Sequence, residues 1–206
     1  MAFVKTALPF MVLSSALMQA GCTQTATAPV VDHQAQGNLE SNNPIGCIDS
    51  TMASNTYTPA DLYQGVAACV SADDLESGAV LYALAGAYGR FDTLRVTDRS
   101  AHQAIPVLQM QALGTLPKER ADRFRKTIMT MTEDPARLQA LCIEIRRIGP
   151  PDYVPRYMVQ HGMGAFSANG GSWLDEAFDA AAGWEQALSS YLHCPAESTG
   201  TDRSAG

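Results

Sequence analysis

Charged residues are scarce in this sequence. They make up 17% of its 206 residues, whereas hydrophobic residues make up 46%, and the formal net charge is −7. A chain with so little charge and so much hydrophobic content is expected to fold rather than to be intrinsically disordered. The negative balance repels nucleic acid and anionic lipid, so neither is expected to bind the protein as a whole.

The sequence also lacks the short motifs that carry common chemistry. It has no Gly-x-Ser-x-Gly nucleophile motif, no His-Glu-x-x-His zinc pair, no glycine-rich phosphate loop and no EF-hand loop. It has no Cys-x-x-Cys pair, which excludes a thioredoxin-like redox site and a zinc ribbon. His193 stands beside Cys194 without a further metal ligand at suitable spacing. On motifs alone, we assign no catalytic residue, no metal and no cofactor.

The apolar run from Ala7 to Cys22 is shorter than the ~20 residues that a membrane-spanning helix needs. Lys5 precedes this run, and two small residues stand immediately before Cys22. This order of charge, apolar run and small residues is typical of a cleaved export signal. We therefore predict a signal peptide at residues 1–21 and export from the cytosol.

The end of this signal, Ala20-Gly21-Cys22, resembles the lipobox of bacterial lipoprotein precursors, although Gln19 stands where leucine is usual. The resemblance implies cleavage before Cys22 and a diacylglycerol group on the sulfur of that residue. Thr23, directly after the cysteine, resembles the sorting pattern of outer-membrane lipoproteins. The implied location is the periplasm, with the protein anchored to the outer membrane by its N-terminal lipid.

Composition divides the rest of the chain into three parts. Residues 22–43 are rich in Thr, Ala, Gln and Asn and are predicted to form a flexible tether. Residues 195–206 are small and polar and are predicted to be a disordered tail. The segment 44–194 between them is long enough for a single domain with a hydrophobic core.

Four cysteines remain if Cys22 carries a lipid. An even number of cysteines in an oxidising compartment favours disulfides, and four cysteines allow three pairings. We favour the pairs Cys47–Cys69 and Cys142–Cys194, which would tie the leading segment to the first helix and the last helix to the core. The alternative is four buried thiols without a bond.

The hydrophobic pattern of the predicted domain is helical. Thr58 with Pro59, and Asp134 with Pro135, are typical helix starts, whereas Pro106 either kinks a helix or starts one. No alternating strand pattern is present, so we predict an all-α fold: a single-domain, irregular bundle of about six helices, stapled by disulfides. The periodic segments are residues 59–70, 75–88, 98–113, 118–131, 135–148, 156–160 and 172–192.

Two of these segments have more specific features. Residues 59–88, with their recurring Ala, Gly and Tyr, resemble a single helical hairpin of the tetratricopeptide or Sel1-like kind, but no second copy follows at a fixed period. The last predicted helix opens at Ser172, whose spacing to Asp175 resembles a capping box. The residues of this helix expected to face inward are Trp173, Ala177, Trp184, Leu188 and Tyr191.

Positive charge is concentrated in the middle of the chain. Of the 14 Lys and Arg residues, all except Lys5 and Arg203 lie between Arg90 and Arg156. One interpretation is that these cations lie on solvated helix faces and are paired within the chain, as Glu144 and Arg147 can be at a spacing of three residues. The other is a basic patch for an acidic partner, formed by Arg120, Arg123, Arg125, Lys126, Arg146 and Arg147.

A second candidate for partner binding is the segment 155–166. It combines turn glycines with Arg156, Tyr157 and His161, a mixture that binding loops use. The alternative is a helix end broken by glycine, with its aromatic residues packed in the core. His102 shares a predicted helix face with acidic and basic residues, an arrangement that can orient an imidazole for acid-base chemistry.

These observations together predict an exported, lipid-anchored binding module that docks a protein partner in the envelope. Small exported helical lipoproteins include immunity proteins that block a secreted toxin and accessory subunits of envelope machines. The alternative function is a hydrolase that acts on envelope polymer or lipid through His161 or His102. A third interpretation is a structural spacer between membrane and wall.

Overall fold

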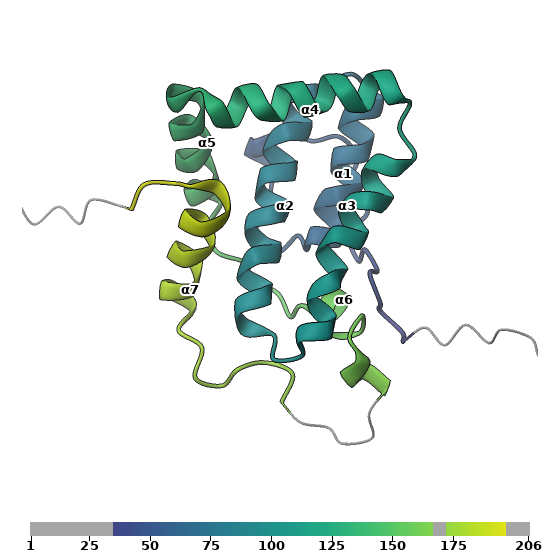
Figure 1. Ribbon diagram of the computed structural model, residues 1–206, viewed down its shortest axis with the longest axis vertical. Coiled ribbons are helices and arrows are strands. Elements are labelled where there is room, and N and C mark those ends of the chain that lie inside the picture. Colours follow the sequence, from purple (N-terminus) through teal and green to yellow (C-terminus); the bar gives the residue numbers. More distant parts are fainter. Residues whose placement is uncertain (1–34, 167–171, 197–206) are drawn as a thin grey trace, which may run out of the picture. The chain divides into compact units, whose positions relative to one another are not determined.

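The computed structural model describes residues 35–166 and 172–196 (Figure 1). The predicted signal peptide (1–21), Cys22 with the tether up to residue 34, and residues 197–206 of the predicted tail lie outside the described residues. Within the described ranges, none of the helices is both long enough and apolar enough to cross a membrane.

Helices build this part of the chain, which confirms the predicted all-α, disulfide-stapled bundle. Across the described residues, the β pairing is limited to an isolated antiparallel bridge between Val96 and Leu174. Short 3-10 turns lie at η1 (Ser50–Met52), η2 (Arg99–Gln103) and η3 (Met163–Phe166), and a π-helical turn, η4 (Leu188–Leu192), follows the last helix. The α-helices are α1 (Pro59–Ser71), α2 (Leu75–Arg95), α3 (Ala104–Gly114), α4 (Lys118–Glu133), α5 (Pro135–Ile148), α6 (Arg156–Val159) and α7 (Ala180–Ala187).

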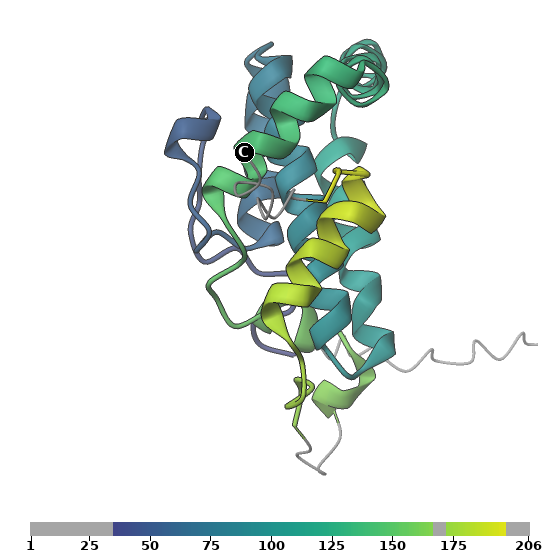
Figure 2. The ribbon, with the colours of Figure 1, turned by 90° about the vertical axis from the view of Figure 1, so that its left-hand side faces the viewer.

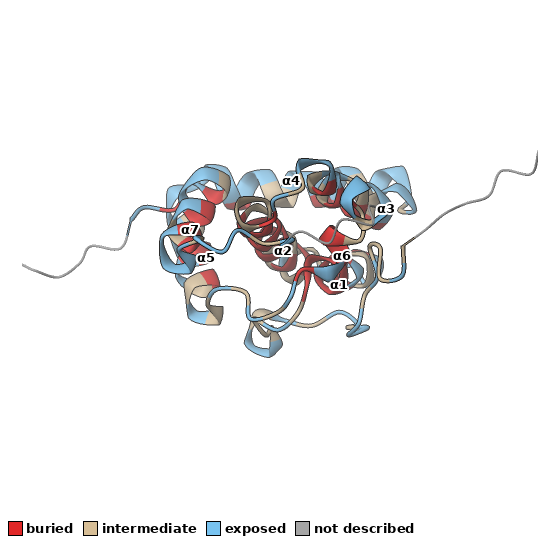
Figure 3. Cartoon of the chain, turned by 90° about the horizontal axis from the view of Figure 1, so that it is seen from below, coloured by how far each residue is buried: buried red, intermediate tan, exposed pale blue. Residues whose placement is uncertain are grey.

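Helix α2 lies at the centre of the bundle. Every residue from Ala83 to Gly89 is buried, and seven consecutive residues cover all sides of a helix with 3.6 residues per turn. Accordingly, α2 packs against α1, α4 and α7, and Figure 3 shows buried residues along its length. Helix α2 also contacts η4, and Gly86 allows this contact, because a Cβ at this position would lie 1.9 Å from the hydroxyl oxygen of Tyr191.

Local signals in the sequence set several helix boundaries as predicted. Thr58 and Asp61 form a capping box around Pro59 at the start of α1. Asp134 accepts hydrogen bonds from the first amides of α5, and this helix ends at Gly149, whose φ is 94°. Pro106 lies in the first turn of α3, so it starts a new helix rather than kinking an existing one.

Helix α4 crosses one end of α1 and α2, and α5 turns away at its far end (Figure 1). The inner face of α4 buries Phe124 and Met131, as the helical spacing predicts. After α5, the chain passes through α6 and η3 and then reaches α7.

The last helix begins later than predicted. Residues 172–175 hydrogen-bond to the end of α2, and the helix starts only after Asp179, which accepts hydrogen bonds from two amides of α7. Ser172 therefore caps no helix; its hydroxyl donates to the Leu174 carbonyl. Trp173 and Ala177, predicted to face inward, are exposed, whereas Trp184 and Leu188 are buried as predicted.

Both predicted disulfides are present. Cys47 is bonded to Cys69, and Cys142 is bonded to Cys194. Because disulfides persist in oxidising compartments, the two bonds indicate an extracytoplasmic location. Cys142 consequently has no thiol that could act as a nucleophile.

The end of the predicted tether lies on the helices. The amide of Leu39 donates to the Tyr157 carbonyl, and Ser41 Oγ and the Asn43 amide both donate to Asp61 Oδ1 at 2.7 Å and 2.8 Å. Figure 2 shows this leading segment, in dark blue, along one side of the helices. Residues 35–43 are therefore part of the packed unit.

Asp61 joins this segment to α1. Its side chain is buried and accepts hydrogen bonds from Ser41, Asn43 and Thr58. Burial by itself raises the pKa of Asp61, but these hydrogen bonds outweigh burial and hold the pKa below its ordinary value. The pKa is therefore lower in the folded chain than in the unfolded chain.

Acid is expected to weaken this junction. The Asp61 carboxylate stabilises the fold above its unfolded pKa of about 3.9, and this stabilisation is lost as the pH falls through the lower, folded value. As the pH is lowered from about 4 to about 2, we expect the free energy of unfolding to fall less for Asp61→Asn than for the unchanged protein. Urea unfolding across this range measures the difference, and parallel pH curves for the two proteins would contradict the prediction.

Candidate functional site

A buried polar cluster joins α6 to α2. The Asp92 side chain is fully buried and accepts hydrogen bonds from Tyr157 Oη (2.6 Å), Tyr153 Oη (3.0 Å) and Arg95 Nε (2.8 Å). Burial raises the pKa of Asp92, and the Arg95 guanidinium opposes that rise. Burial also raises the pKa of both tyrosines well above its ordinary value, so their hydroxyls remain protonated and donate.

Tyr157 belongs to this buried cluster and is not a surface residue. The sequence placed Tyr157 among the partner-binding candidates, but its side chain is 1% exposed and fills the core between α6 and α2. Arg156, beside it, is exposed and remains open to a partner. The two residues differ in exposure because successive residues of α6 point about 100° apart around the helix axis.

The two candidate catalytic histidines bond to uncharged groups. His161 Nδ1 lies 2.9 Å from Asn38 Oδ1, and His102 Nε2 lies 3.0 Å from the Val96 carbonyl. Burial lowers the pKa of His161, which favours its neutral form. An imidazole acting as a general base is usually oriented by a carboxylate, so this geometry gives the hydrolase alternative no support.

The candidate basic patch does not form one surface. Arg120, Arg123 and Arg125 lie in the first half of α4, whereas Arg146 and Arg147 lie near the end of α5, which starts where α4 ends (Figure 1). The sequence predicted two separate helices here but not the angle between them, so it placed both sets in one patch.

Most of these cations also have partners within the chain. Arg120 donates to the Ser71 carbonyl and Arg123 pairs with Asp73, while Lys126 is exposed. The remaining ion pairs are Arg125 with Asp122, Arg146 with Glu185 and Arg147 with Glu144. Four of the six residues therefore form ion pairs within the chain, as the alternative interpretation expects, and Arg120 bonds to a backbone carbonyl.

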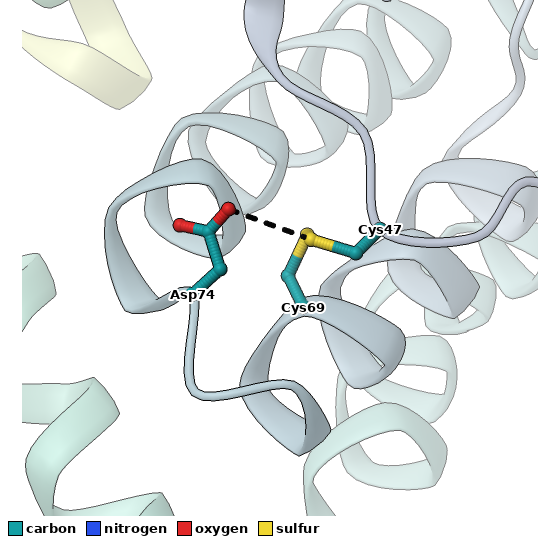
Figure 4. A group of neighbouring side chains, drawn as sticks. All are labelled: Cys47, Cys69 and Asp74. Atoms are coloured by element: carbon teal, nitrogen blue, oxygen red, sulfur yellow. Dashed lines mark hydrogen bonds between the residues drawn. A yellow bond between two sulfur atoms is a disulfide. The ribbon is translucent and has the colours of Figure 1, made fainter.

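One group of side chains resembles a metal site. Cys47, Cys69 and Asp74 bring two sulfurs and a carboxylate within 4.8 Å of one another (Figure 4). The sulfurs are bonded to each other, however, and metals bind cysteine as a thiolate. Asp74 Oδ2 lies 3.7 Å from Cys47 Sγ, so the group is a disulfide beside a carboxylate.

Three exposed apolar side chains belong to segments that hydrogen-bond to the turn 97–100. Met163 is 71% exposed, Phe166 is 54% exposed and Trp173 is 52% exposed. Arg99, in the same turn, is exposed as well. We call these four residues the Trp173 surface.

Hydrogen bonds fix the backbone of the Trp173 surface. Amides of η3 donate to Asp98 Oδ2 at 2.7 Å and to Ser100 Oγ at 2.8 Å, and the Thr97 amide donates to the Trp173 carbonyl at 3.0 Å. The hydrogen bond from Ser100 contributes most to lowering the pKa of Asp98, which keeps this acceptor ionised. Two segments that lie far from this turn in the sequence, η3 and residues 172–174, are thus bonded to it.

Sequence reasoning identified this surface only in part. The segment 155–166 was chosen for its glycines and aromatic residues, and it contributes Met163 and Phe166. Trp173 was missed because its spacing matched the buried stripe of a helix that begins further on.

Comparisons with known proteins identify no relative. No protein-family model, no curated protein and no solved structure matches the chain. The resemblances to a lipoprotein signal and to a tetratricopeptide or Sel1-like hairpin remain predictions from the sequence. The geometry of the described residues is therefore the basis for a function.

Proposed function

We propose that this chain is an exported, lipid-anchored helical module of the periplasm that docks a protein partner through the Trp173 surface. The exposure of Met163, Phe166 and Trp173 around a single turn is the observation that carries the proposal. Single exposed apolar residues are ordinary on protein surfaces, whereas a group of them is typical of an interaction site. The disulfides support the extracytoplasmic location.

The residue types of the surface suit a protein interface. Aromatic residues, Met and Arg are enriched at interface cores, and Trp and Arg are frequent among the residues that dominate binding energy. The hydrogen bonds to Asp98 and Ser100 hold the surface in place before a partner arrives. A preorganised surface loses less conformational entropy on binding.

The remaining parts of the proposal come from the sequence. The lipobox-like end of the signal supports a lipid at Cys22 and attachment to the outer membrane. A secreted toxin, blocked as immunity proteins block theirs, and a component of an envelope machine are the two kinds of partner in this proposal. Both present a folded protein surface to the domain.

A pull-down from envelope extract with the full chain tests this proposal. We expect the double variant Phe166→Ser and Trp173→Ser to weaken capture of a saturable partner by roughly tenfold or more, because it removes two interface anchors. Ile143 is 61% exposed on α5, away from this surface, so Ile143→Ser is the matched control and should capture normally. Equal capture by the double variant and the control would overturn the proposal.

A further inference from the structure

A hollow of about 200 Å³ lies between α2, α4, α5 and η4. Its lining carries no charged side chain and includes Ala79 and Ala83 of α2, Ile128 and Met131 of α4, and Leu141 of α5. The space exists in part because α2 presents two alanines, one turn apart, where larger side chains would fill it. An apolar lining of this kind suits the apolar part of a ligand.

The few hydroxyl groups of the lining do not change this character. Thr132 Oγ1 donates to the Ile128 carbonyl of its own helix at 3.0 Å, so its hydrogen-bonding capacity is used within α4. The Tyr191 ring closes one side of the hollow and is seated against α2 at Gly86. The interior therefore suits a hydrocarbon group.

A second hollow, of about 250 Å³, adjoins the first and shares Met131 and Leu141 with it. Methionine is flexible, so movement of the Met131 side chain would join the two spaces. Together, the two volumes lie within the range of roughly 300–1,000 Å³ that is typical of ligand pockets.

The second hollow has charge of both signs in its lining. Arg137 contributes a positive charge and is paired with Glu76. Glu144 contributes a carboxylate that is paired with Arg147, and the hydrogen bond from Arg147 lowers its pKa to about 2. An elongated site thus has an uncharged inner part and an outer part that complements a head group with both charges.

We propose that the joined hollows bind a monoacyl phospholipid with a zwitterionic head. The acyl chain occupies the space between Ala83 and Leu141, the phosphate lies near Arg137, and the ammonium group lies near Glu144. The Trp173 surface, formed by other elements, takes no part in this site. Lipid binding and protein docking are therefore independent proposals, and failure of one leaves the other unaffected.

Binding of myristoyl lysophosphatidylethanolamine to the full chain, below its micelle concentration, tests the proposal. Titration calorimetry and native mass spectrometry should show saturable binding with a single lipid per chain. Ala83→Leu fills the hollow and should weaken binding by roughly tenfold or more. Ala182 is exposed on α7, so Ala182→Leu is the matched control and should bind normally.

Two further ligands test the acyl chain and the head group of the lysolipid separately. Glycerophosphoethanolamine, which lacks the chain, should not bind measurably, and myristic acid, which lacks the ammonium group, should bind more weakly than the lysolipid. Met131→Ala widens the shared passage, so it should favour a palmitoyl over a myristoyl lysolipid relative to the unchanged protein. This variant also provides a readout if Ala83→Leu does not fold.

Two results would overturn the proposal. Absence of saturable lysolipid binding, or binding that neither Ala83→Leu nor Met131→Ala changes, would exclude the hollow as the site. Equal affinity for myristic acid would exclude the zwitterionic phospholipid as the ligand. The docking variants Phe166→Ser and Trp173→Ser should leave lipid binding intact, which distinguishes this outcome from failure of the docking proposal.

Discussion

Replacing Cys142 and Cys194 together by alanine is expected to lower the free energy of unfolding by about 4 kcal/mol. The bond joins residues 52 positions apart, so it removes many conformations from the unfolded chain. Alanine is chosen because both cysteines are buried, and serine would add a buried hydroxyl. Urea unfolding of the variant, with secondary structure followed by circular dichroism, measures the loss.

The other disulfide provides the comparison for this prediction. Cys47 and Cys69 are 22 positions apart, so replacing both by alanine should cost less, roughly 3 kcal/mol. The order of the two losses follows from loop length. A smaller loss for the Cys142 and Cys194 variant than for this one would show that native contacts, rather than the constraint on the unfolded chain, determine the effect.

Removal of the Asp92 carboxylate is expected to have a similarly large effect. Asp92→Ala leaves the Arg95 side chain, which is only 13% exposed, without its ion partner and two tyrosine hydroxyls without their acceptor. Breaking a buried ion pair in this way typically costs about 3–5 kcal/mol. Thermal and urea unfolding of the variant provide the measurement.

A surface aspartate serves as the control for Asp92. Asp122 accepts from Lys118 and Arg125, but all three side chains are well exposed. Asp122→Ala should therefore change the free energy of unfolding by less than about 1 kcal/mol. If the two variants were equally mild, the buried cluster would not be what holds α6 to α2.

Local signals explain why so much of the fold could be predicted. Pro59 and Pro135 start helices through constraints on their own backbone, and the caps beside them act within three residues. The disulfide pairing was also predictable, because each bond joins an early or late segment to a helix with a clear apolar face. These features need little knowledge of the rest of the chain.

Contacts between distant residues explain what could not be predicted. Leu174 pairs with Val96 at the end of α2, and this pairing delays the last helix. Tyr157 is buried because it reaches Asp92, 65 residues earlier, and Arg123 pairs with Asp73, 50 residues earlier. None of these three distant partners is visible in the local pattern. For that reason, the sequence misplaced Trp173 and Tyr157 and overstated the basic patch.

The positions of the two disulfides have a mechanical consequence. When force is applied to the two ends of the domain, residues 48–68 and 143–193 cannot be drawn out, because each lies within a covalently closed loop. Extension is then confined to the chain between Cys69 and Cys142 and to the short ends. A force applied from the C-terminal side therefore meets the cross-link at Cys194 before it reaches η4.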